Sequence, residues 1–247
     1  MRFTTGEISL LGDRDDNQDR VSIVSDDDAA LLVVVDGMGG HAQGARAADL
    51  ALKVLLGEFW EISHPVFDPL GFLHLSLSRA HDAVVDLGAD LKIEERPRAT
   101  CAVCLVQEGR AYWAHIGDSR IYHIRKKRIL ERTRDHSHVE VLLREGLISE
   151  DEIHVHPMRN FVECCLGGST ALPEMSVGRG RRLIGGDVLL LCSDGFWAGL
   201  TDQGIAKAFV DGKKLVQDVL DNLGREAVAT SAPGSDNTTA AAMNWTG

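Results

Sequence analysis

The chain has 247 residues, of which 44% are apolar, so it can bury a large core in one domain or two. Its 26 Lys and Arg against 37 Asp and Glu give a formal net charge of −11, which argues against nucleic acid or an anionic membrane as the main partner. No run approaches the roughly 20 apolar residues that span a bilayer, the N-terminus lacks a signal-peptide pattern, and the five cysteines fit reduced thiols. We therefore expect a soluble, cytoplasmic protein.

The first third of the chain is expected to hold three strands followed by two helices. Short strands are predicted at 5–11 and 20–24. The apolar run 30–35 predicts a buried strand that ends at Asp36. Helical patterns follow at 42–60 and 70–91, and residues 63–69 break the pattern between them. The carboxylate of Asp36 is therefore expected at the tip of a buried strand.

The middle of the chain is β-like. Strands are predicted at 99–106, 110–116, 119–124 and 129–133, because these segments alternate apolar and polar residues or are β-branched. Glu108-Gly109 and Gly117-Asp118 are expected turns. The basic run 125–128 is expected to be a solvated hairpin tip.

The last part of the chain mixes helices and strands. A short helix at 139–145 should end before Gly146, and Ser149 followed by Glu152 predicts a capped helix start. Residues 154–160 are irregular. A buried strand is predicted at 188–192, helices at 202–209 and 213–230, and a final strand at 238–244. Because strands and helices do not alternate strictly, we predict an α+β fold over residues 1–247 as a single domain, with one antiparallel sheet packed on another and helices on both outer faces.

Five short acidic motifs are the most informative feature of the chain. Each places an aspartate beside a strand-like run or a small residue. They are Asn17-Gln18-Asp19, Val35-Asp36-Gly37-Met38-Gly39-Gly40-His41, Gly117-Asp118-Ser119-Arg120, Cys192-Ser193-Asp194-Gly195 and Ser235-Asp236-Asn237. Carboxylates concentrated at one point hold hard divalent cations, and two such cations side by side can hydrolyse phosphate esters.

Each motif alone also has a plain structural explanation. Asp36 and Asp194 both follow a buried strand and precede glycine, which is what a strand-to-helix turn requires. Asp118 suits a hairpin turn, and Asp236 suits a turn in which its side chain hydrogen-bonds the following backbone. Two Asp-Gly sites at strand ends in one chain favour the functional interpretation.

The spacing and order of these motifs resemble those of the metal-dependent protein phosphatases of the PPM (type 2C) family, in its compact bacterial form. The resemblance runs from Arg14-Asp15-Asp16-Asn17 to Asp236-Asn237 and covers almost the whole chain. The run 36–41 is highly specific, and the segments 133–137 and 146–148 also match. The family implies a phosphoserine/phosphothreonine phosphatase with two antiparallel sheets sandwiched between outer helices, and a metal centre at one edge of the sandwich.

The resemblance assigns a metal role to six residues. Asp36 should bridge two Mg²⁺ or Mn²⁺ ions, with the Gly37 carbonyl on one of them, and Asp194 and Asp236 should complete the other. Asp19 should hold metal-bound waters. Asp118, with Asp194, should form a third, weaker metal site.

Two catalytic roles follow from the same resemblance. Arg14 should grip the substrate phosphate, which suits a guanidinium fork. The leaving oxygen needs a proton. The eukaryotic branch of the family has a histidine directly after the Asp-Gly pair, but this chain has Met38 there, as in the bacterial branch. His41 is the candidate replacement, and its plain alternative is a polar residue at a helix start.

Some segments depart from the family pattern or determine specificity. Arg98-Ala99-Thr100 stands where Gly-Thr-Thr is usual, which removes no metal ligand, and Thr238 replaces an aliphatic residue. Residues 139–168 map to the flap subdomain, which can influence substrate choice.

Two weaker signals are expected to carry no chemistry. Cys101 and Cys104 form a CxxC pattern, but in a strand residues three apart face opposite sides of the sheet and chelate poorly. The histidines at 136, 138, 154 and 156 are expected to be ordinary loop residues.

The sequence therefore predicts a phosphoprotein phosphatase that reverses a bacterial Ser/Thr kinase, with a monomer as the default state. Two alternatives stay open. A phosphatase-like binding module without catalysis should lack core aspartates, and a two-metal esterase would act on small phosphoesters. The chain has no Walker A sequence, so a nucleotide binder of that class is excluded.

Overall fold

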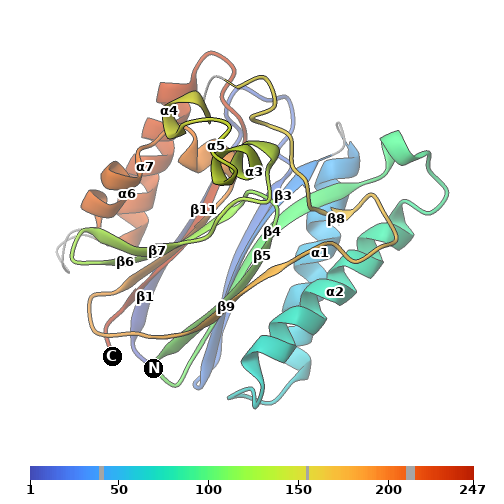
Figure 1. Cartoon of the computed structure of the whole chain (residues 1–247). Coiled ribbons are helices and arrows are strands. Elements are labelled where there is room, and N and C mark those ends of the chain that lie inside the picture. Colours follow the sequence, from blue (N-terminus) through green and yellow to red (C-terminus); the bar gives the residue numbers. More distant parts are fainter. Residues whose placement is uncertain (39–41, 154–155, 210–214) are drawn as a thin grey trace.

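Two antiparallel sheets lie face to face, with helices on both outer faces (Figure 1). The computed structural model describes residues 1–38, 42–153, 156–209 and 215–247. The arrangement confirms the predicted α+β sandwich. In the described residues, no helix is both long enough and apolar enough to cross a bilayer.

The first sheet has five strands in the order β1-β11-β10-β6-β7. Their bounds are β1 Phe3–Leu10, β6 Arg120–Arg125, β7 Arg128–Arg132, β10 Val188–Cys192 and β11 Thr238–Trp245. Helices α6 (Asp202–Ala208) and α7 (Val216–Ser231) lie on its outer side, with α7 packed on β1 and β11. The short helix α5 (Asp194–Trp197) follows β10 directly.

The second sheet has the order β2-β3-β4-β5-β9, with β8 paired to β4. Its strands are β2 Asp19–Ser25, β3 Ala29–Met38, β4 Arg98–Gln107, β5 Arg110–Ile116, β8 Leu166–Gly167 and β9 Ser176–Arg182. Helices α1 (Ala42–Glu61) and α2 (Pro69–Leu87) cover its outer face. The 3₁₀ helix η1 (Ile93–Glu95) precedes β4, and the helices α3 (His138–Arg144) and α4 (Glu150–Ile153) lie in the segment after β7.

Because successive side chains of a strand point to opposite faces of its sheet, the core is divided into three layers. Leu31 and Val33 of β3 face α1 and α2, whereas Leu32 and Val34 face the opposite sheet. A third cluster packs α7 against β10 and β11. Cys101 belongs to the helix-facing layer and Cys104 to the layer between the sheets, so the prediction that they face opposite sides is confirmed.

The strand register brings the acidic motifs to one end of the sandwich. Asp36 pairs with Asp19 on β2 and with Thr100 on β4. In the other sheet, Cys192 pairs with Ala240 and with Arg120, so Asp194, Asp236 and Asp118 all lie just beyond that end. Both chain termini lie at the opposite end, where Phe3 pairs with Trp245 (Figure 1).

The structure differs from the sequence predictions in several of the described segments. Strands β8 and β9 were not predicted. Helix α2 ends at Leu87 rather than 91, because the Gly88 N–H turns back to the Val85 carbonyl. The predicted helix over 213–230 is observed at 216–231, and its first residues lie outside the described part of the chain. The basic hairpin tip is confirmed, with Lys126 and Lys127 at positive φ.

Candidate active site

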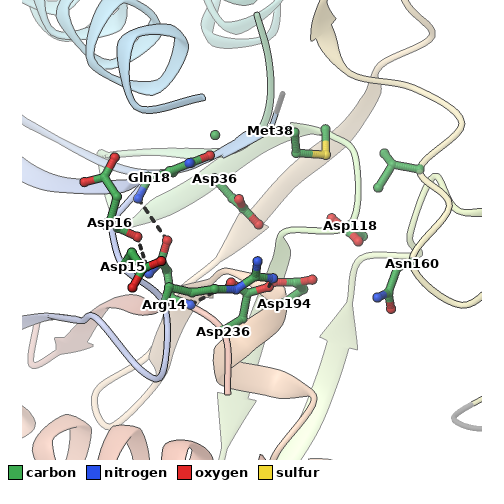
Figure 2. A pocket seen from close by; sticks show the side chains of 13 residues that line it. Arg14, Asp15, Asp16, Gln18, Asp36, Met38, Asp118, Asn160, Asp194 and Asp236 are labelled. Carbon is green, nitrogen blue, oxygen red and sulfur yellow. Dashed lines mark hydrogen bonds and ion pairs between the residues drawn. The ribbon is translucent and has the colours of Figure 1, made fainter. Parts of the chain in front are cut away.

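A cavity of about 440 Å³ opens at the end of the sandwich where the acidic motifs meet. Figure 2 shows the side chains of Asp36, Asp118 and Asp194 around one space, with the guanidinium of Arg14 reaching to Asp236. Six of the eight predicted site residues line this cavity: Arg14, Asp36, Gly37, Asp118, Asp194 and Asp236. Asp19 lies behind it, and His41 lies outside the described residues.

Asp36 and Asp194 owe their positions to buried strands. Each stands at or just after the end of an apolar run, β3 or β10, where the backbone has no freedom to turn the carboxylate away. Two glycines allow the close packing behind them. A Cβ on Gly37 would come within 2.2 Å of the Gly44 carbonyl oxygen, and one on Gly195 within 2.1 Å of the Asn237 carbonyl oxygen. Any larger residue would therefore push the end of β3 away from α1, or the start of α5 away from the residue before β11.

Asp118 sits in the turn between β5 and β6. Gly117, at φ +98°, makes the turn, and the Trp197 indole N–H donates to the Asp118 carbonyl at 2.9 Å. The Arg120 guanidinium lies 3.4 Å from the Trp197 ring centroid and makes two 2.8 Å hydrogen bonds to Asp135. The turn is thus fixed by side chains from three separate segments.

The electrostatics of the carboxylates are dominated by burial and mutual repulsion. Burial, and then the nearby carboxylates, raise the pKa of Asp36 and of Asp194 well above the usual range. Burial followed by repulsion from Asp135 raises the pKa of Asp118 to about 7. Burial raises the pKa of Asp19 to about 6, although Ser193 Oγ donates to its Oδ2 at 2.8 Å. These carboxylates therefore resist being ionised together, and bound cations would relieve their repulsion.

The donor set fits hard divalent cations. It consists of carboxylate oxygens and a backbone carbonyl, which are the ligands that Mg²⁺, Mn²⁺ and Ca²⁺ take. In the described parts of the chain, no three His, Cys, Asp or Glu side chains are already gathered at ion-binding distance. Arg14 Nη2 donates to Asp236 Oδ2 at 2.7 Å, so among the described residues the side-chain cation paired with this cluster is Arg14.

Several residues that hold the site together were missed from the sequence. Asp13 Oδ2 accepts hydrogen bonds from the N–H groups of Gly234 and Ser235 and so ties the loop before Asp236 to the N-terminal loop. Asn237 belongs to a motif that the sequence singles out, but its anchoring role was not predicted: it donates to the carbonyls of Leu11 and Asp16. Asn160 and Val162 line the cavity from the far side. These roles carry no local signal, because each joins segments that are separated in the sequence, as Asp13 and Gly234 are.

The histidines singled out in the sequence have hydrogen-bond partners among the described residues, and His138 begins helix α3 rather than lying in a loop. His136 contacts Ser176, His138 pairs with Glu163, and His156 accepts from the Met158 N–H, so each has its own local partner. His154 lies outside the described residues. All five cysteines are free.

The fold and the cavity together define a two-sheet protein with an acidic centre at one edge. The family model described as protein phosphatase 2C matches residues 11–231. The chain therefore belongs to the protein phosphatase 2C family, and the predicted resemblance is confirmed.

Named relatives are protein phosphatases of bacteria. The chain is 33% identical over 183 residues to the serine/threonine protein phosphatase PstP of Mycobacterium tuberculosis, covering 73% of this chain and 34% of that protein. It thus spans about a third of that relative's length. It is 32% identical to the protein phosphatase PhpP of Streptococcus pneumoniae, covering 96% of this chain and 97% of that protein.

A solved structure with a similar fold contains metal ions. The catalytic domain of PstP in complex with two manganese ions has 28% identity and a TM-score of 0.81, with 99% of this chain and 98% of that chain covered.

Proposed function

We propose that this protein is a serine/threonine protein phosphatase that hydrolyses phosphoserine and phosphothreonine in phosphoproteins. The observation that carries the proposal is the meeting of Asp36, Asp118, Asp194 and Asp236 around one cavity that also contains Arg14. Membership of the protein phosphatase 2C family and the names of the relatives support the same reaction.

The proposed cofactor is Mn²⁺ or Mg²⁺, with two ions in the centre and a third, weaker one. Asp36 would be a ligand of both central ions, and the Gly37 carbonyl would bind one of them. Asp194 and Asp236 would complete the other ion, and Asp118 together with Asp194 would bind the third. When bound, the cations supply an activated water and neutralise charge on the phosphoryl oxygens. The two manganese ions in the similar PstP structure support this assignment.

The remaining residues would position the substrate and handle protons. Asp19 would accept hydrogen bonds from water at the back of the site, since its carboxylate is buried beside Asp36. Arg14 is exposed at the mouth of the cavity, where its guanidinium would bind two oxygens of the phosphoryl group. His41 remains the proposed proton donor to the leaving oxygen, because Met38 cannot serve.

The substrates are proposed to be phosphoproteins made by a bacterial Ser/Thr kinase. The segment 139–168 is proposed as a flap subdomain of a single catalytic domain, because Asn160 and Val162 of this segment line the cavity. The free cysteines support a cytoplasmic location. The binding module without catalysis is not favoured, since every core aspartate is present. The small-molecule phosphoesterase is not favoured either, because the named relatives are protein phosphatases.

The test is hydrolysis by purified protein as Mn²⁺ is titrated. A phosphothreonine peptide and p-nitrophenyl phosphate should both be hydrolysed in a metal-dependent manner, and a chelator should stop both reactions. A nucleotide should react far more slowly than the peptide. No hydrolysis of either phosphatase substrate by Mn²⁺-loaded protein would reject the proposal, and a preference for the nucleotide would favour the small-molecule alternative.

A further inference from the structure

A second concave surface, the side groove, opens directly beside the catalytic cavity. Its volume is about 600 Å³. Its principal lining residues are Met38, Ile93, Arg98, Phe161, Val162 and Leu172. Met38, Asn160 and Val162 line both the groove and the cavity, so the two form one continuous depression.

The side groove exposes apolar side chains to water. Ile93 is 63% exposed, Phe161 48% and Leu172 45%, although Ile93 is far from the other two in the sequence. Single exposed apolar residues are ordinary, but several gathered in one hollow mark a binding surface. Because the hollow leads into the cavity, a single molecule can occupy both.

The groove is built on rigid elements. Arg98 begins β4 and pairs with Gly167 of β8. Its Nη2 donates to the Ile93 carbonyl at 2.9 Å, and a Cβ on Gly168 would lie 2.7 Å from its Nε, so the guanidinium packs against that backbone. The Gly167 N–H donates to His81 of α2 at 3.2 Å. The groove is therefore preformed, which lowers the entropy cost of binding.

The side groove is also lined by a positively charged side chain, that of Arg98. Arg98 makes no ion pair with a carboxylate in the parts of the chain that the structure describes. The carboxylate of Glu163 at the groove is turned to His138, with 2.8 Å between Glu163 Oε1 and His138 Nδ1. A ligand in the groove thus meets apolar side chains and an available cation, which favours acidic over basic groups.

We propose that the side groove binds the apolar residues that flank the phosphorylated serine or threonine of a substrate protein, and that Ile93 and Leu172 determine specificity for them. The inference rests on the proposed function. A chain in extended conformation advances about 3.3 Å per residue, so with the phosphate at Arg14 the residues about two to four positions away reach the groove. Arg98 disfavours basic residues at the same positions.

The first experiment measures kcat and KM for phosphothreonine peptides that differ only in flanking residues. Leucine, serine, glutamate or lysine occupies positions two to four on the N-terminal side or the C-terminal side. We expect leucine on one side to raise kcat/KM about tenfold over serine, chiefly by lowering KM, and lysine there to be the poorest. Equal kcat/KM for leucine and serine peptides on both sides would overturn the proposal.

The second experiment uses Ile93→Ser/Leu172→Ser. The double variant should lose the preference for leucine while its hydrolysis of p-nitrophenyl phosphate stays unchanged, because neither residue lines the cavity. Leu75→Ser is the matched control, since Leu75 is 49% exposed on α2 and lines neither surface. Retention of the leucine preference in the double variant would contradict the assignment.

The outcomes separate this inference from the proposed function. If the wild-type protein hydrolyses neither the peptides nor p-nitrophenyl phosphate, the proposed phosphatase activity itself is rejected. Normal hydrolysis of p-nitrophenyl phosphate without any peptide preference rejects the groove alone. Sedimentation across a concentration series completes the test: a dimer that Ile93→Ser/Leu172→Ser abolishes, without a peptide preference, would assign the groove to a second copy of this chain and overturn the proposal.

Discussion

At the scale of single residues, the site is a balance between repelling carboxylates and the cations that they attract. Burial raises the pKa of Asp36, and repulsion by four nearby carboxylates raises it further. These are Asp19, Asp194, Asp118 and Asp236. Within the described residues, the only side-chain cation that makes an ion pair with this group is Arg14, which bonds Asp236. The repulsion among these buried carboxylates therefore lowers the stability of the metal-free protein.

Replacing Asp36 by asparagine tests how much the repulsion among the carboxylates destabilises the metal-free protein. Asp36→Asn removes one of the repelling charges, so the melting temperature of metal-free protein should rise by a few degrees, at about 2–4 °C per kcal/mol for a chain of this size. The measurement is thermal unfolding in a chelator. Asp49→Asn, which alters only a surface pair with Arg20, should change little. A lower melting temperature for Asp36→Asn would show that the carboxylate is stabilised rather than strained.

Arg14 should have opposite effects on metal binding and on catalysis. Arg14→Ala removes the cation that competes for Asp236, so Mn²⁺ should bind several-fold more tightly by calorimetric titration. It also removes the proposed phosphate ligand, so kcat/KM for a phosphopeptide should fall by roughly 10²-fold. Arg128→Ala, at the exposed hairpin tip, should change neither quantity. Weaker Mn²⁺ binding by Arg14→Ala would contradict the competition.

At the scale of elements, the turn that carries Asp118 is held by α5 and by the segment after β7. Trp197 of α5 bonds the Asp118 carbonyl and stacks on Arg120, and Arg120 is paired with Asp135. Both members of this ion pair are largely buried, at 11% and 8% side-chain exposure. Losing one partner would leave an uncompensated charge in the interior.

Asp135→Asn should therefore destabilise the protein by about 3–5 kcal/mol. Urea unfolding followed by circular dichroism measures this. The control is Glu131→Gln, which breaks the exposed pair with Arg181 and should cost less than about 1 kcal/mol. Similar small losses in both variants would mean that Arg120 finds water or another partner.

The same elements show what could be predicted from sequence. Strands β3 and β10 were predicted because an apolar run ending in aspartate is a local signal. Strand β9 was not, since its Gly178 and Gly180 alternate with arginines and suggest a loop. Those glycines make room for the rings of Trp113 and Tyr112 on neighbouring β5, a contact that only the fold creates. The site follows the same rule. Its strand-end aspartates were predictable, whereas Asp13, Asn160 and the groove beside Arg98 depend on segments joined across the chain.

At the scale of the whole molecule, the centre joins the two sheets. Asp36 and Asp19 belong to one sheet, and Asp194 and Asp236 flank strands of the other. The hydrogen bond from Ser193 to Asp19, at 2.8 Å, already crosses between them. A cation held by ligands from both sheets binds only the folded chain, so it must stabilise the fold.

Adding Mn²⁺ should raise the melting temperature. At 100 times the dissociation constant the gain is about 2.7 kcal/mol, which corresponds to roughly 5–10 °C for a chain of this length. Thermal unfolding with and without Mn²⁺ measures the shift, and excess chelator should reverse it. An unchanged melting temperature at saturating Mn²⁺ would argue against a centre shared by the two sheets.

The central claim is that the carboxylates around Asp36 make this chain a metal-dependent phosphoprotein phosphatase. The most direct test is phosphate release from a phosphothreonine peptide, with and without Mn²⁺, by the wild-type protein and by Asp36→Asn. We predict release only by wild-type protein with Mn²⁺, with Asp36→Asn folded but inactive. Near-normal, Mn²⁺-dependent release by Asp36→Asn, or none by the wild-type protein, would contradict the account.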